Sequence, residues 1–191
     1  MHELEVLHPA AWVLIPESAT IITDPDLDDS SPRWPKPFRG SWRAIGQAVR
    51  DAVVAAQRRT PDPFLATITV PLNIELSAPE LFVVEEWLLG GLEIDAESGE
   101  VTDGRHRLWN VKAGGLSEVP ATLSAIGDAV KFYIRDDADQ LMGYPTKETL
   151  LLWEESLEWW RSPDASAWRE INPDHESRFR EVMSAWSRRL S

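Results

Sequence analysis

The stretch of sequence that decides the predicted fold is residues 101–110, which read Val-Thr-Asp-Gly-Arg-His-Arg-Leu-Trp-Asn. The end of an apolar strand runs into Asp-Gly and then into a helical pattern. We expect Asp103 to be the N-cap of that helix, because its carboxylate can accept from the first free backbone N–H groups. Gly104 allows a tight turn and lets a ligand approach the backbone closely. The stretch therefore predicts a strand, a tight turn and a helix, in that order.

The first turn of the expected helix carries two arginines, Arg105 and Arg107. Positive charge is unfavourable at this end of a helix, because the helix dipole favours anions there. An anion such as a phosphate, bound by both guanidinium groups, would explain the placement. Ion pairs with local carboxylates are the open alternative. The carboxylates close in sequence include Glu97, Glu100 and Glu118.

His106 lies between these arginines, and the adjacent positive charges favour its neutral form. A neutral imidazole could hydrogen-bond a substrate or act as a base; the other interpretation is a hydrogen bond that orients the turn. The four histidines lack the spacing of a zinc site, and His175 is expected at the surface. The aspartates of residues 24–29 lack the glycine and distal glutamate of a calcium loop. We therefore predict no metal site formed by the protein alone.

Five segments around the opening stretch follow one another in a fixed order. A strand at residues 92–95 precedes the D-G-R-H-R turn, and a helix at 108–113, a glycine turn at 114–116 and a Val-Pro strand at 119–123 follow it. This order resembles the ParB/sulfiredoxin-like superfamily, over residues 65–127. The resemblance implies an α+β fold with a small mixed sheet and packed helices. It also implies a nucleotide or phosphate site formed by Gly104, Arg105, His106 and Arg107.

Branches of the superfamily differ within this turn. Sulfiredoxins carry G-C-H-R, and because Arg105 replaces the reactive cysteine in a chain without cysteine, sulfinic-acid reduction is excluded. The chromosome-partitioning branch carries G-E-R-R with a glutamate linked to CTP, whereas the free-serine kinase branch carries the closer D-G-H-H-R. If the protein is an enzyme, the resemblance implies a nucleotide-dependent hydrolase or phosphotransferase. Its candidate catalytic residues are His106 and Asp103, and its candidate cofactor is Mg²⁺ carried with a nucleotide.

Composition limits the possible functions further. The chain has 191 residues, a formal net charge of −13, ten tryptophans and no cysteine, which excludes disulfides and thiolate catalysis. The acidity argues against general DNA binding, because phosphate contacts need Lys and Arg. There is no basic N-terminal leader and no apolar run of the ~18 residues that a membrane span needs. We therefore expect a cytoplasmic protein without membrane contact.

We divide the chain into three parts that we expect to form one compact unit. Residues 1–64 contain one or two N-terminal strands, an Asp/Pro-rich loop and a helix. Residues 65–145 form the ParB/sulfiredoxin-like core, and residues 146–191 form a Trp-rich helical C-terminal appendage. The helix at residues 41–59 is predicted from apolar residues at steps of three and four. The other elements that local patterns predict are strands at 65–72, 119–124 and 130–134, a helix ending at Leu89, a hairpin over 92–102 and a last helix after Asp174.

Two function classes are open at this level. In the first, the protein binds a nucleotide or another phosphate-bearing ligand at residues 103–107, with or without catalysis. In the second, it is an inactive interaction protein of the antitoxin, immunity or adaptor type, which uses its acidic surface and its Trp-rich C-terminal helices. The position of Trp159, Trp168 and Trp186 distinguishes the two, because exposed clustered rings favour a partner surface.

Overall fold

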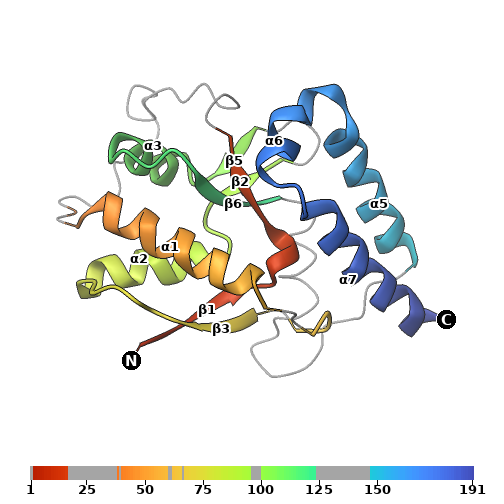
Figure 1. Ribbon diagram of the computed structural model, residues 1–191, viewed down its shortest axis with the longest axis horizontal. Helices are drawn as coiled ribbons and strands as arrows, with labels where there is room; N and C mark the ends of the chain where they lie inside the picture. Colours follow the sequence, from red (N-terminus) through yellow and green to blue (C-terminus); the bar gives the residue numbers. More distant parts are fainter. Residues whose placement is uncertain are drawn as a thin grey trace.

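The computed structural model describes residues 2–16, 38, 40–59, 62–65, 67–95, 100–123 and 147–191. Its helices and small mixed sheets confirm the α+β class. Figure 1 shows the strands in the middle of the molecule, with the C-terminal helices on one side and the remaining helices on the other. The predicted strand at 130–134, the aspartate-rich loop and the hairpin turn at 96–99 lie outside the described residues.

The N-terminal segment forms two strands rather than one. Strand β1 (Glu3–Leu7) is followed by a short 3-10 helix, η1 (Pro9–Ala11), and by strand β2 (Trp12–Ile15). The η1 turn separates the two strands, which enter different sheets. Strand β1 pairs with β3 (Thr67–Pro71) in a two-stranded antiparallel sheet, whereas β2 is the first strand of a four-stranded sheet of order β2-β6-β4-β5.

Helices α1 (Trp42–Gln57) and α2 (Ala78–Leu88) begin where their capping residues predict. The Ser41 hydroxyl accepts from the Ala44 N–H at 3.2 Å, and Ser77 forms a capping box with Glu80. Glu80 also accepts from the Ser41 N–H at 2.6 Å, so one carboxylate joins the starts of both helices. The hydrogen bonds from Ser41 and Ser77 lower the pKa of Glu80.

The segment that carries the opening stretch forms three of the four strands of the larger sheet and one helix. Strands β4 (Glu93–Ile94) and β5 (Val101–Asp103) are antiparallel, as the hairpin prediction requires. Helix α3 (Arg105–Ala113) follows, and β6 (Val119–Leu123) then runs parallel to β4 and antiparallel to β2. The elements of the fixed order thus occur as the sequence predicts.

The C-terminal segment consists of α5 (Lys147–Arg161), η2 (Pro163–Ala165), α6 (Ser166–Ile171) and α7 (His175–Leu190). Helices α5 and α7 run side by side at the edge of the molecule. Asn172, between α6 and α7, holds the outer edge of β2. Its Oδ1 accepts from the Leu14 N–H at 2.7 Å, and its Nδ2 donates to the Leu14 carbonyl at 2.8 Å.

One hydrophobic core joins all three parts of the chain. Residues of β1, β2, α1, α2 and β6 share it with Leu157, Trp160, Phe179 and Trp186 of the C-terminal helices. His175 is also in this interior. It is 1% exposed and its ring lies 4.5 Å from that of Trp160, so the expected surface position was wrong. Packing of α7 buries His175, and a local sequence pattern does not report that contact.

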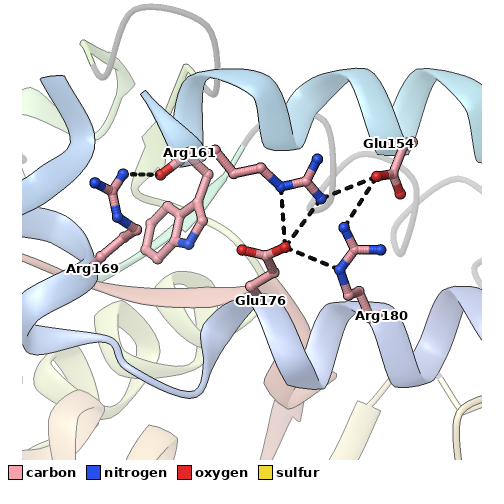
Figure 2. Close-up of polar contacts among 6 residues, drawn as sticks. Glu154, Arg161, Arg169, Glu176 and Arg180 are labelled. Atoms are coloured by element: carbon pink, nitrogen blue, oxygen red, sulfur yellow. Dashed lines mark hydrogen bonds and ion pairs between the residues drawn. The ribbon is translucent and has the colours of Figure 1, made fainter. Parts of the chain in front are cut away.

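The outer faces of α5 and α7 are joined by an ion-pair network (Figure 2). Arg161 binds Glu154 and Glu176, each at 3.0 Å, and Arg180 binds the same two carboxylates at 3.1 and 3.0 Å. Arg169, from α6, donates to the carbonyl oxygens of Trp160 and Ser162 at the end of α5. These arginines therefore bind groups of the protein itself, and the network is structural.

Candidate functional site

The second residue of the D-G-R-H-R turn is a glycine that the local packing requires. Gly104 has φ 79° and ψ 18°, the left-handed region that favours glycine. A Cβ atom at Gly104 would lie 2.5 Å from the Gly91 carbonyl oxygen and 2.8 Å from the Leu92 Cα. The group that approaches Gly104 closely is thus the backbone of the chain itself, and not the ligand that the sequence suggested.

Asp103 is not the N-cap of α3, and that prediction was wrong. Asp103 is the last residue of β5, where it pairs with Glu93, and the left-handed Gly104 is the N-cap instead. The Asp103 carboxylate accepts from the adjacent Gly104 N–H at 2.6 Å. Because the chain turns one residue later than predicted, no side chain caps the start of α3.

Arg107 points into the fold and holds the turn that precedes β4. Its Nη1 donates to the Gly91 carbonyl, and a Cβ at Gly91 would lie 3.0 Å from the Arg107 Cζ. Burial lowers the pKa of Arg107, and the negative charges of Asp103 and Glu86 act in the opposite direction. Arg107 therefore joins α3 to the segment between α2 and β4.

Arg105 and His106 lie in different environments from Arg107. Arg105 is exposed. His106 is half-buried, and its Nε2 is buried without a hydrogen-bond partner. The backbone carbonyl of His106 accepts from the Asn110 side chain at 2.7 Å, a bond within α3. The exposed Arg105 guanidinium is consequently the side-chain group of the turn that an outside ligand can reach directly, whereas the His106 Nε2 is enclosed.

One of the carboxylates named as alternative partners of the motif has a different partner. Glu118 forms an ion pair with Arg50 of α1, Glu100 is exposed next to β5, and Glu97 lies outside the described residues. Within the part of the chain that the structure describes, no three His, Asp or Glu side chains gather as a metal site would require. Over the same residues, no helix is both long enough and apolar enough to cross a membrane.

The tryptophan rings that distinguish the two function classes lie mostly in the interior. Trp168 and Trp186 are 2% and 3% exposed. Trp159 is half-buried and packs edge-on against Trp168, with 5.7 Å between the ring centroids. The side chain of Trp153, also on α5, lies outside those described. These three rings therefore contribute to the core rather than to an exposed cluster.

Comparison with protein-family models, with curated proteins and with solved structures found no match for this chain.

Sequence reasoning missed the partner of the turn, the Gly90–Gly91 segment. These glycines indicate only the end of α2, and Gly90 indeed has φ 100°. Nothing local shows that the Gly91 carbonyl receives Arg107. A weak signal does exist, because a second glycine is not needed to end a helix and its presence can indicate close approach of another segment.

Proposed function

We propose that the protein binds a phosphate-bearing small molecule at the first turn of α3. Arg105 contacts the phosphate, the backbone N–H groups of the turn donate to its oxygens, and His106 donates or accepts one further hydrogen bond. The observation that carries the proposal is the helix start without a side-chain cap, at which an exposed arginine stands at the end that favours anions.

The residue roles in this proposal differ from those suggested by the motif alone. Arg107 is a positioning residue, because its guanidinium holds the Gly91 carbonyl and is half-buried. Gly104 provides the bend, and Asp103 fixes it by accepting from the Gly104 N–H. The ParB/sulfiredoxin-like resemblance favours a nucleotide as the ligand, and it stays part of the proposal.

The binding test is a calorimetric titration of the full chain with inorganic phosphate, ATP, ADP, CTP and GTP, each with and without Mg²⁺. We expect one of these ligands to bind. We expect Arg105→Ala to weaken its affinity by about tenfold or more, which corresponds to the loss of one charge-assisted hydrogen bond. Arg188→Ala, an exposed arginine near the end of α7, is the matched control and should leave the affinity unchanged. Absence of binding by all five ligands, or equal affinity in Arg105→Ala, would refute the proposal.

Nucleotide hydrolysis or phosphotransfer is the further step that the resemblance suggests, with His106 and Asp103 as catalytic residues. The test is phosphate release from the nucleotide that binds. We expect His106→Gln to lower the rate while changing the affinity less than Arg105→Ala does. A bound nucleotide that is not turned over would restrict the function to binding.

The alternative of an interaction protein rested on the acidity and the Trp-rich C-terminal helices, and exposure of three tryptophans was the observation expected to favour it. Trp168 and Trp186 are buried instead, and Trp159 packs against Trp168. The large apolar side chains that are exposed among the described residues lie on separate segments, and they are Leu65, Phe82 and Leu151. Scattered apolar side chains are normal on protein surfaces, so no observation favours this second function.

A further inference from the structure

A cavity of about 110 Å³ lies where η1, the end of α1 and the helix α7 meet, away from the α3 turn. One water molecule needs about 10–15 Å³ of such space, so the cavity can hold several waters or a small organic molecule. Its lining combines apolar groups such as Pro63 and Val182 with polar side chains from three parts of the sequence. The polar lining residues are His8, Gln57, Arg59, Arg178 and Glu181.

His8 lines this cavity and has a fixed tautomer. The side chain is 4% exposed, and its Nδ1 accepts from the Ala10 N–H at 3.1 Å. In a neutral imidazole only one nitrogen carries the proton, so that proton is on Nε2. The Nε2 atom is buried and has no hydrogen-bond partner in the described structure. A buried donor without an acceptor is costly, and a ligand oxygen in the cavity would satisfy it.

The protonation state of His8 agrees with this assignment. Burial lowers the pKa of His8 to about 4, although the nearby Asp62 carboxylate raises it. The imidazole is therefore neutral at pH 7, and it offers an N–H group rather than a positive charge.

Two arginines add charged donors to the same cavity. Arg59 donates one N–H to the Thr69 carbonyl, and Arg178 contacts the Asp174 carboxylate at 3.4 Å. A guanidinium group has five N–H donors, so these single contacts leave donors for a ligand. The only acidic side chain in the described lining is Glu181. The lining thus carries two positive charges and one negative charge, and Arg178 is already paired with Asp174. Arg59 is then the cation available to a ligand carboxylate, and Glu181 is the acceptor available to a donor group on the same ligand.

We propose that this cavity is a binding site for a small monocarboxylate that also carries a hydroxyl or amino group. The ligand carboxylate accepts from His8 Nε2–H and from the guanidinium groups of Arg59 and Arg178. The hydroxyl or amino group donates to Glu181. A phosphate dianion fits less well, because it would place a second negative charge near Glu181 without a matching cation.

The test is a titration of the ¹⁵N-labelled full chain, followed by the amide chemical shifts of Ala10 and Arg178. The probes are L-lactate, glycolate, L-alanine and glycine, with acetate as the carboxylate that lacks a donor and inorganic phosphate as the competing oxyanion. We expect at least one hydroxy- or amino-carboxylate to shift these amides saturably, and acetate to bind more weakly. During the carboxylate titrations the α3 turn amides of residues 105–107 should not move, which separates this site from the one proposed above.

His8→Asn is the informative variant. An asparagine at this N-cap position keeps an acceptor for the Ala10 N–H and removes the Nε2 donor. We expect it to weaken carboxylate binding by about tenfold, and Arg178→Gln to weaken it at least as much. Glu181→Gln should remove the preference over acetate, and Arg105→Ala at the α3 turn should change nothing.

Three results would overturn the inference. The first is the absence of a saturable shift with all four hydroxy- and amino-carboxylates. The second is an affinity in both His8→Asn and Arg178→Gln that equals the affinity of the parent protein. The third is tighter binding of phosphate than of the carboxylates, measured at Ala10 and Arg178. Loss of nucleotide binding in Arg105→Ala with intact carboxylate binding would leave it standing, because the two sites share no residue.

Discussion

The α3 turn and the His8 cavity are two places, among the described residues, where cationic and imidazole side chains lie close together, and they are formed in opposite ways. At the turn, neighbours in sequence separate in space: Arg105 stays in solvent, whereas Arg107 enters the fold to hold Gly91. At the cavity, Arg59 and Arg178 come from distant parts of the chain and line one space. Proximity in sequence and convergence in space are therefore separate properties.

The physical origin of this difference is the range of the interactions that place each side chain. The bend at Gly104 depends on a local backbone conformation, which a glycine in the sequence indicates. The direction of Arg107 depends on where the Gly90–Gly91 segment packs. The cavity depends on how α7 and the end of α1 pack around η1, and no short motif encodes it.

Acidification should produce the largest decrease in the free energy of unfolding. The groups responsible are His8, next to η1, and His175, at the start of α7. Burial lowers the pKa of His8 to about 4 and that of His175 to about 3, while the unfolded chain has values near 6.5. Between those values the unfolded state binds more protons, so stability is full above about pH 6.5 and falls as the pH decreases. From pH 7 to 5 we expect a loss of about 2 kcal/mol for each histidine, measured by urea unfolding.

Two variants sharpen this prediction. His175→Phe, which places an apolar ring in the same buried position, should remove about half of the acid sensitivity. His2→Gln changes an exposed histidine and should leave the sensitivity as it is. An unfolding free energy that stays constant from pH 7 to 5 would contradict the buried neutral state of both imidazoles.

Gly104→Ala tests whether the α3 turn is a packing contact. The new Cβ would lie 2.5 Å from the Gly91 carbonyl oxygen in a left-handed backbone, so we expect a loss of about 3 kcal/mol. Gly115 is the matched control, because its φ is 88° but a Cβ there meets nothing within 4 Å. Gly115→Ala should cost only the backbone term, about 1 kcal/mol. Equal losses in thermal or urea unfolding would mean that Gly91 does not constrain the turn.

The smallest expected change in stability distinguishes Arg107 from Arg105. Arg107→Met removes the bond to the Gly91 carbonyl while keeping an apolar stem, and we expect a loss of about 1.5 kcal/mol. Arg105→Met changes an exposed side chain and should stay within about 0.5 kcal/mol of the parent. If urea unfolding gave the two variants the same stability, Arg107 would not have the positioning role that distinguishes it from Arg105.

Much of the fold could be predicted because local capping residues mark where several helices begin. Ser41 and Ser77 begin α1 and α2 through bonds to residues three positions away, and these depend on nothing distant. Asp103 is an exception to this rule. It is a favourable capping residue, but α3 begins one position later than predicted and Gly104 is the N-cap.

The candidate sites were less predictable for the same reason. The sequence indicated the groups of the α3 turn, but the burial of Arg107 required a contact 16 residues away. His175 looked like a surface residue near a helix start, and its contact with Trp160 buried it. His8 attracted no functional interpretation, because its significance arises from Arg178 and Glu181, which stand far along the chain.

The double hydrogen bond between Asn172 and Leu14 also has a consequence for self-association. Among the described strands, β2 is the outermost of its sheet, and an open outermost strand can recruit a strand from another molecule. Asn172 imitates such a partner by donating to and accepting from the same residue. The segment between α6 and α7 therefore blocks the addition of a strand from another molecule at this edge. Asn172→Ala would leave the N–H and carbonyl groups of Leu14 free to pair with such a strand, and the protein would then polymerise more readily.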